Sequence, residues 1–354
     1  RQDVARAERV VVERDAAGEP TGVLREEAAW RFKHRHMAVP DEEYLTAMRA
    51  GMKLAASRGV TAVHDKDGWL GALRLWQQLG QRSLRVWQSI PADRVDQVAE
   101  LGLTSGLGDE FLRLGYLKTF MDGTLGSQTA WMSDGSGVVI TTSEELEQIV
   151  RDGAEAGWPV GVHAIGDAAN RAALDAFERS REVWQPRGLR QRIEHAQCLA
   201  ADDVGRFAEL GVAVSLQFSH APSDEELAKR YWADRLDGTY SFRSLLDSGA
   251  LLANGSDAPV EELEPWAGVI SAVLDHWRED QKLTLEQALH AVCVAPAWLS
   301  HDERVRGTLV PGRYADLVVL DRDPFACEPE QLRDVQVVAT MLGGRWTHNP
   351  PPWD

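Results

Sequence analysis

Short apolar runs alternate with amphipathic stretches through most of the chain. Helix-like segments such as 142–157 and 202–211 separate most of the runs. This alternation predicts βαβ units and a parallel sheet that is buried on both faces. The spacing favours a TIM-like (β/α)8 barrel, and no glycine-rich phosphate loop follows the first run, as a doubly wound nucleotide fold would require. The seven runs are VTAVHD (60–65), LRVWQSI (84–90), LRLGYLKTFMDG (112–123), WPVGVHAIGD (158–167), LRQRIEHAQ (189–197), GVAVSLQFSH (211–220) and GALLANGSDAP (249–259).

The two ends of the chain have other patterns. Residues 8–25 predict two short strands around the turn DAAGEP, and 41–58 predict a helix. Residues 305–325 and 335–348 are rich in strand formers and predict a small β module packed on the barrel.

These patterns predict three domains in this α/β chain. We expect a hairpin at 1–25, the barrel at 26–304, and part of a small β-sandwich domain at 305–354. A closed barrel of this type needs eight strands. We expect the missing eighth strand to precede Arg1, which agrees with a chain that does not start with methionine.

Composition limits the partners. The 354 residues are 44% hydrophobic and carry a formal charge of −17, which argues against nucleic acid or an anionic membrane as partner. The sequence contains no apolar run long enough to span a membrane. The cysteines are widely spaced and odd in number, which predicts reduced thiols rather than a disulfide framework; they are Cys198, Cys293 and Cys327. We expect a cytoplasmic protein.

Four of the predicted strands carry polar residues of the kind that bind metals. Lys118 lies within the third run, His163 and His195 near the ends of the fourth and fifth, and Asp257 near the end of the seventh. The carboxyl ends of barrel strands converge on the active site, so these four side chains predict a divalent-metal site.

Each of these residues also has a structural interpretation. A strand-end histidine can make structural hydrogen bonds, Lys118 can be a surface lysine, and Asp257 can start a turn or cap a helix. His64 ends the first run and is a further candidate ligand. His34 and His36 in KHRH lie in a basic segment, and we expect them at the surface.

Several motifs, in the right order, resemble the YtcJ-like branch of the amidohydrolase superfamily over essentially the whole chain. They are DAAGEPTGVLREEA, LKTFMDGTLGSQTA, VGVHAIGDAANRAALDAFE, RIEHAQ, SLQFSH, GSDAPVEELEPW and GTLVPGRYADLVVLDRDPF. The resemblance implies a metal-dependent hydrolase on a distorted (β/α)8 barrel with a small β-sandwich domain. N-substituted formamide deformylases belong to the same branch.

The resemblance also implies roles for the candidate residues. Lys118 matches a lysine that CO2 converts to a carbamate bridging two metals, His163 and His195 match the histidines that hold one metal, and Asp257 matches the metal-binding general base. The metal would be zinc, although iron or manganese suits the same ligands. It would lower the pKa of water from about 16 to about 7, and the resulting hydroxide would attack a carbonyl carbon.

Other positions receive less definite roles from the same resemblance. His220 matches a position near the substrate and could polarise the carbonyl. Asp122 and Asp167 could orient the ligands or form turns. The family usually has proline where Phe218 stands. Three tryptophans near strand ends could line a hydrophobic pocket; these are Trp131, Trp232 and Trp266.

The chain departs from the family at its start. The family's first strand carries an H-x-H pair for the more buried metal, and the sequence contains no such strand. The missing part could belong to a longer polypeptide, could come from a separate chain, or could be lost in an inactive product.

These departures leave several functions open. The leading hypothesis is hydrolysis of an amide or formamide C–N bond in a small molecule. The alternatives are an inactive amidohydrolase-like protein and an ester or carbamate hydrolase. A homodimer is expected on frequency alone.

Overall fold

The computed structural model describes residues 10–37, 39–66, 71–80 and 82–350. The chain divides into two compact units, Arg1–Met48 and Arg49–Asp354, which are described separately. The first unit holds the predicted hairpin, with strand β1 (Val10–Arg14) antiparallel to β2 (Pro20–Glu26). Asp15 closes the turn by accepting hydrogen bonds from the backbone of Ala17 and Glu19.

Two helices follow the hairpin. Helix α2 (Glu27–His36), which sequence analysis did not predict, contains the KHRH segment, and His36 is exposed as expected. The side chain of His34 lies outside the described residues. The predicted helix over 41–58 is α3 (Asp41–Ser57), which crosses the boundary between the units.

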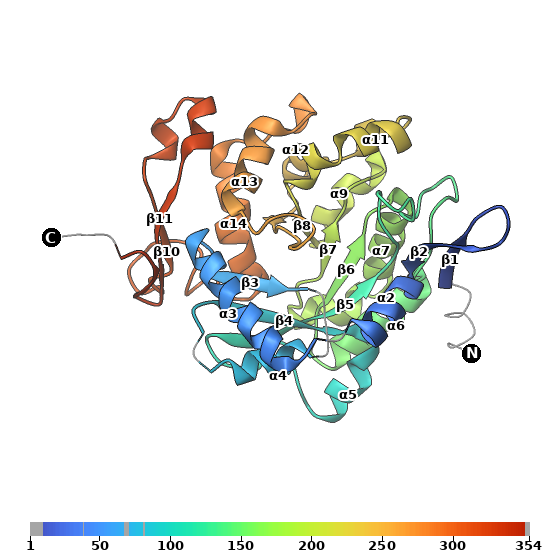
Figure 1. Ribbon diagram of the computed structural model, residues 1–354, viewed down its shortest axis with the longest axis horizontal. Coiled ribbons are helices and arrows are strands. Elements are labelled where there is room, and N and C mark those ends of the chain that lie inside the picture. The colour runs from blue at the N-terminus through green and yellow to red at the C-terminus, as the bar shows by residue number, and fades with distance from the viewer. Residues whose placement is uncertain (1–9, 38, 67–70, 81, 351–354) are drawn as a thin grey trace. The chain divides into compact units, whose positions relative to one another are not determined.

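The second unit is built on a seven-stranded parallel sheet (Figure 1). Its strands lie side by side in chain order, and each matches one of the seven predicted runs. Among the described residues β3 and β9 form the two edges of this curled sheet. The predicted TIM-like fold is therefore confirmed as seven strands of such a barrel. The strands are β3 (Ala62–Asp65), β4 (Arg85–Pro91), β5 (Leu112–Phe120), β6 (Val160–Ala164), β7 (Arg192–His195), β8 (Ala213–Leu216) and β9 (Leu252–Asn254).

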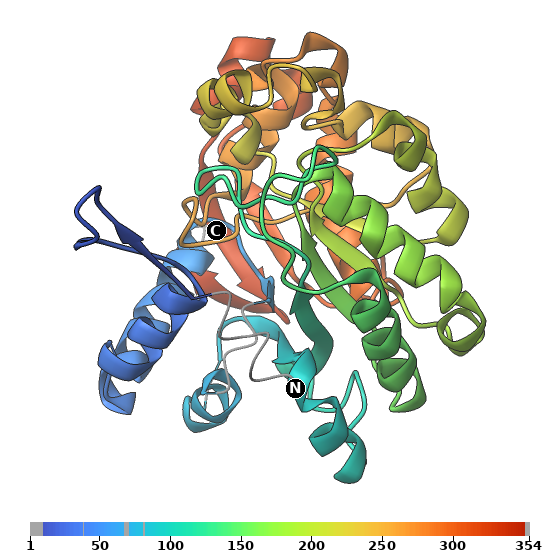
Figure 2. The same ribbon diagram turned by 90° about the vertical axis from the view of Figure 1, so that its right-hand side faces the viewer.

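Helices pack on the outer side of the sheet (Figure 2). Every residue of β6 and β8 is buried, as expected for strands covered on both faces. Capping boxes start two of the helices: Thr142 pairs with Glu145 at α6, and Thr284 with Gln287 at α14. The helices are α4 (Ala72–Gln78), α5 (Val95–Glu100), α6 (Ser143–Glu155), α7 (Asp167–Arg179), α8 (Arg181–Trp184), α9 (Ala201–Leu210), α10 (His220–Ser223), α11 (Glu225–Tyr231), α12 (Phe242–Asp247), α13 (Pro265–Ile270) and α14 (Leu285–Leu299).

A small antiparallel sheet ends the second unit. Its strands are β10 (Leu317–Leu320), β11 (Val337–Leu342) and β12 (Arg345–His348), in that order. Arg85 at the start of β4 makes a bidentate ion pair with Asp316, at 2.7 and 3.0 Å, which joins the small sheet to the barrel strands.

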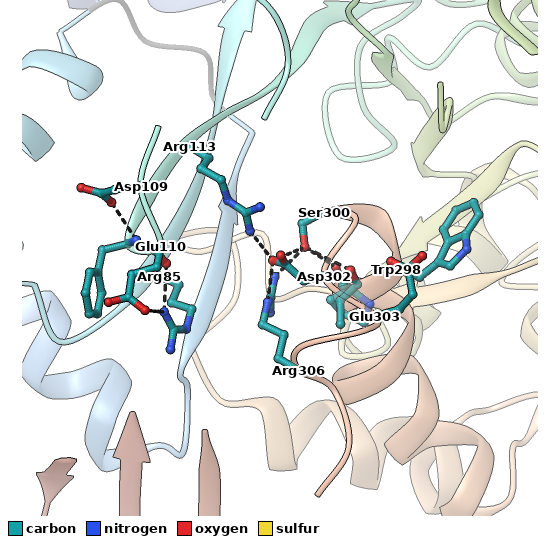
Figure 3. A network of polar contacts seen from close by, with 12 residues as sticks. Arg85, Asp109, Glu110, Arg113, Trp298, Ser300, Asp302, Glu303 and Arg306 are labelled. Atoms are coloured by element: carbon teal, nitrogen blue, oxygen red, sulfur yellow. Dashed lines mark hydrogen bonds and ion pairs between the residues drawn. The ribbon is translucent and has the colours of Figure 1, made fainter. Parts of the chain in front are cut away.

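A polar network lies at the amino-terminal ends of the strands, opposite the ends where sequence analysis predicts the site (Figure 3). Asp302, just after α14, accepts hydrogen bonds from Arg113 at the start of β5 and from Arg306, the latter at 2.8 Å. The Asp302 and Arg306 side chains are only 7% and 10% exposed, so the carboxylate compensates guanidinium charge that water cannot reach. This network ties α14 to the sheet.

Asp302→Ala should lower the free energy of unfolding by roughly 3–5 kcal/mol, because it leaves two guanidinium groups without their carboxylate. Chemical denaturation followed by circular dichroism measures this change. Glu303→Ala is the matched control, since Glu303 is half-exposed and pairs with Arg190; its loss should cost no more than about 1 kcal/mol. If both variants lower the free energy of unfolding by the same amount, the buried network does not stabilise the protein more than the more exposed ion pair does.

Candidate metal centre

Lys118, His163 and His195 lie on three neighbouring strands and reach the same region inside the curled sheet. The rings of His163 and His195 have centroids 4.5 Å apart in an edge-to-face arrangement. The charge of Lys118 acts on both histidines. All three side chains are buried. Three of the four predicted site residues therefore lie near one another.

The backbone at the end of β7 explains how His195 joins this group. Residues alternate between the two faces of a strand, so His195 should face away from the side occupied by Glu194. His195 and Ala196 instead have positive φ angles of 78° and 44°, which interrupt the alternation at the strand end. This irregularity brings the His195 ring beside His163.

Both histidines are neutral near pH 7. Burial, followed by the charge of Lys118, lowers the pKa of His163 to about 3. Burial, together with His163 and Lys118, also lowers the pKa of His195 well below its ordinary value. Neutral imidazole is the form that binds metals.

Asp257 differs from Lys118, His163 and His195 in burial. It follows β9 in a turn with a φ angle of 55°, and its side chain is exposed. Within the ranges that the structure describes, no three His, Cys, Asp or Glu side chains are arranged to hold a metal ion. The described chain therefore contains two histidines beside a lysine, which fits part of a metal-binding set.

A charged cluster that sequence analysis missed lies next to these residues. Glu194 on β7 pairs with Lys66 at 3.2 Å and with Arg192 at 2.6 Å. Burial raises the pKa of Glu194, but Arg192, Lys66 and Lys118 outweigh burial and hold it below its ordinary value. Arg192 also donates a hydrogen bond to Nδ1 of His64 at 3.0 Å, so His64 has a structural partner. The spacing Arg-x-Glu in RIEH could have indicated the pair of Arg192 and Glu194, because it places both side chains on the same face of the strand.

The backbone of β6 accommodates this cluster. A Cβ atom at position 161 would lie 2.3 Å from Nζ of Lys66. Gly161 therefore leaves the space into which the lysine extends.

Asp122, directly after β5, organises the neighbouring loops. Its buried carboxylate accepts hydrogen bonds from the backbone N–H groups of Trp131, Ile165 and Gly166, at 2.9, 3.0 and 2.8 Å. It also lies 3.7 Å from Nε2 of His163. Asp122 therefore ties the loop after β5 to the backbone that follows β6, close to His163.

Asp167 has a different position. It begins α7 and accepts hydrogen bonds from the backbone and hydroxyl of Ser133, at 2.8 and 2.6 Å. These contacts tie the loop that follows β5 to the helix that follows β6.

His220 also lies beside His195, with the two rings stacked and their centroids 6.2 Å apart. Its Nδ1 faces Nε2 of Gln197 at 3.1 Å. Its Nε2 is buried and has no hydrogen-bond partner among the described residues. His220 can therefore present a ring N–H group to a bound molecule.

Phe218, where the resemblance led us to expect proline, makes a contact that proline could not. The backbone N–H of Phe218 donates to Oδ1 of Asn254 at 2.8 Å, which links the ends of β8 and β9. Proline has no N–H group and could not form this bond.

The three tryptophans considered as pocket residues differ. Trp232 is buried, and Trp266 donates from its indole to the Leu332 carbonyl at 2.8 Å, which is a packing role. Trp131 lines a surface hollow of about 370 Å³ together with Asp167 and Arg171.

Comparisons with known proteins show the family to which the chain belongs. The family model described as "Amidohydrolase family" matches residues 2–348. The chain belongs to the amidohydrolase family. YtcJ of Bacillus subtilis (strain 168) is 30% identical over 95% of this chain and 67% of its own length. The N-substituted formamide deformylase of Arthrobacter pascens is 25% identical over 94% of this chain and 66% of its own length.

A solved structure supports the same assignment for this amidohydrolase. The uncharacterized metal-dependent hydrolase of Pyrococcus horikoshii OT3 is 29% identical, with a TM-score of 0.78 over 90% of this chain and 68% of that one. The chain thus spans about two thirds of the length of these relatives. Within the described ranges, no helix is both long and apolar enough to cross a bilayer.

Asp122→Ala should lower the free energy of unfolding by at least about 3 kcal/mol, because each buried N–H group that loses its acceptor costs about 1–3 kcal/mol. Thermal and chemical denaturation measure the change. Asp134→Ala is the matched control in the same loop, because the Asp134 carboxylate is exposed, and it should leave the midpoint nearly unchanged. If Asp122→Ala and Asp134→Ala have the same denaturation midpoint, Asp122 does not stabilise the protein by joining the two loops.

Proposed function

We propose that this amidohydrolase is a metal-dependent hydrolase that cleaves a C–N bond of an amide or formamide in a small molecule. The observation that carries the proposal is the pair of buried neutral histidines, His163 and His195, beside Lys118. These three residues and Asp257 would hold a divalent ion, for which zinc suits nitrogen ligands combined with carboxylate-type oxygens. A bound ion of this kind makes water nucleophilic at neutral pH.

The hydrogen bonds of the two histidines support metal binding. Nε2 of His163 lies 2.9 Å from the Gly123 carbonyl, and Nδ1 of His195 lies 2.7 Å from Oε1 of Gln217. Both partners are oxygen acceptors, so the bonded nitrogen of each neutral ring carries the proton. The other nitrogen of each ring keeps a lone pair for a metal. The site residues therefore have the tautomers that ligation needs.

The charges around Lys118 support its conversion to a carbamate. Lys66, Lys118 and Arg192 act on the carboxylate of Glu194, so three cations surround one buried anion. Burial, followed by the charge of Arg192, lowers the pKa of Lys66, and Lys118 acts in the same direction as a like charge does. A carbamate at Lys118 would replace a cation by an anion. Lys66 and Arg192 would then be the two cations, and Glu194 and the carbamate the two anions. The carbamate would also supply oxygen ligands, which a lysine amine cannot.

The remaining residues suit the handling of a carbonyl substrate. His220 would donate from its unpaired Nε2–H to the substrate carbonyl oxygen. Asp257, exposed after β9, would accept the proton of the attacking water and return it to the leaving nitrogen. The similarity to a deformylase of N-substituted formamides supports a formyl amide as the first substrate class to test.

Lys118→Met should remove the bound metal and lower kcat/KM for an N-substituted formamide by at least about 10³-fold, because a metal ion contributes several kcal/mol of transition-state stabilisation. Elemental mass spectrometry gives the metal content, and native mass spectrometry should show one CO2 adduct in the unsubstituted protein and none in the variant. Lys53→Met is the matched control, since Lys53 is an exposed lysine of α3.

The outcomes separate the alternatives. Unchanged metal content and activity in Lys118→Met would contradict the proposed site. A protein that binds metal but hydrolyses a matched ester and not the amide would place the chemistry on C–O bonds. A protein that neither binds metal nor hydrolyses either substrate would be an inactive amidohydrolase-like protein.

A further inference from the structure

We infer that Gln217 is a positioning residue that holds the proton of His195 on Nδ1 and thereby leaves the Nε2 lone pair free to bind. The inference deepens the proposed metal site and rests on it. Gln217 follows β8 directly, and Oε1 of its side chain lies 2.7 Å from Nδ1 of His195. Both side chains are buried, so water does not compete for this contact.

A second hydrogen bond fixes the orientation of the Gln217 amide. Its Nε2 donates to the Ser215 carbonyl at 3.3 Å. A carbonyl only accepts, so the NH2 end of the amide must face Ser215 and the oxygen must face the ring. The oxygen also only accepts, and therefore His195 must supply a proton from Nδ1. A neutral imidazole has a single ring proton, so Nε2 carries the lone pair.

The neighbouring histidine has the opposite arrangement. His163 uses Nε2 toward the Gly123 carbonyl at 2.9 Å, so its lone pair lies on Nδ1. A backbone carbonyl sets the tautomer of His163 and cannot be substituted. A side chain sets the tautomer of His195, so this choice can be changed by a single substitution while the strand and both rings remain.

Gln217→Leu should therefore change the tautomer of His195. In the metal-free protein labelled with ¹⁵N at histidine, two-bond ¹H–¹⁵N correlation spectra should show His195 protonated on Nδ1. The leucine variant should show Nε2 protonation or a mixture, because the acceptor is gone. Gln217→Glu keeps an oxygen acceptor and should keep Nδ1 protonation. The signals are assigned by their loss in His195→Asn.

Gln197→Leu is the matched control. Gln197 is also buried in this region, but it contacts His220 and not Nδ1 of His195. This variant should leave the His195 signals in the Nδ1-protonated pattern. Nε2 protonation of His195 in the unsubstituted protein, or an unchanged pattern in Gln217→Leu, would overturn the inference. The first of these results needs no variant, so the inference stays testable even where a variant fails to fold.

Zinc titration of the same proteins tests the consequence for binding. Gln217→Leu should weaken zinc affinity about 10–100-fold, as loss of a ligand-orienting partner typically does, and Gln217→Glu should not. If Gln217→Leu changes the tautomer of His195 but leaves the zinc affinity unchanged, Gln217 does not position His195 for metal binding. Absence of zinc binding in the unsubstituted protein would contradict the proposed function, whereas the tautomer spectra decide the role of Gln217 on His195 independently.

Discussion

The hydrogen-bond register of the parallel strands β5, β6 and β7 is the constraint on which the candidate centre depends. Phe120 is paired with His163, and Ala164 with His195, so each strand offers its polar residue near the same level of the sheet. Lys118 pairs with Gly161, two residues before His163. A shift by one residue in either pairing would turn a strand's side chains to its other face. The buried apolar residues of these strands therefore fix the site as well as the core; they include Leu117, Val160, Val162 and Ile193.

The same burial controls the chemistry of the polar residues. Desolvation keeps His163 and His195 neutral, and the charge of Lys118 acts in the same direction. For Glu194 desolvation and charge oppose each other, and three cations outweigh the burial. One buried region thus holds uncharged imidazoles beside an ionised carboxylate. Burial favours the neutral form of all three groups, and only at Glu194 do the neighbouring charges reverse its effect.

Sequence analysis predicted the seven parallel strands because each is an apolar run of the right length between helical segments. It also placed Lys118, His163 and His195 near one another, because the carboxyl ends of barrel strands converge. The positive φ angles after Glu194 could not be predicted, although they bring His195 to the same side as His163. Helix α2 was missed because its mixed basic and aromatic residues show no clear apolar face.

Contacts between strands that are far apart in the sequence could not be predicted either. Lys66 and Glu194 are separated by most of the barrel in sequence, and their pairing depends on the space left by Gly161. Gln217 lies inside the motif SLQFSH, where His220 drew attention as the reactive residue. Its importance depends on the bond to Ser215, which fixes the direction of an amide that could otherwise point either way.

The two ends of the barrel strands have different roles: one carries a stabilising ion-pair network and the other carries the candidate site. At the amino-terminal ends Asp302 binds Arg113 and Arg306, and the carboxylate is matched by guanidinium groups within the network. At the carboxyl-terminal ends Nε2 of His220 is buried without a partner among the described residues. A buried polar atom of this kind costs free energy unless something binds it. His220 thus offers an unmatched buried nitrogen at the end of the sheet where the family resemblance places the substrate, and the Asp302 network lies at the other end.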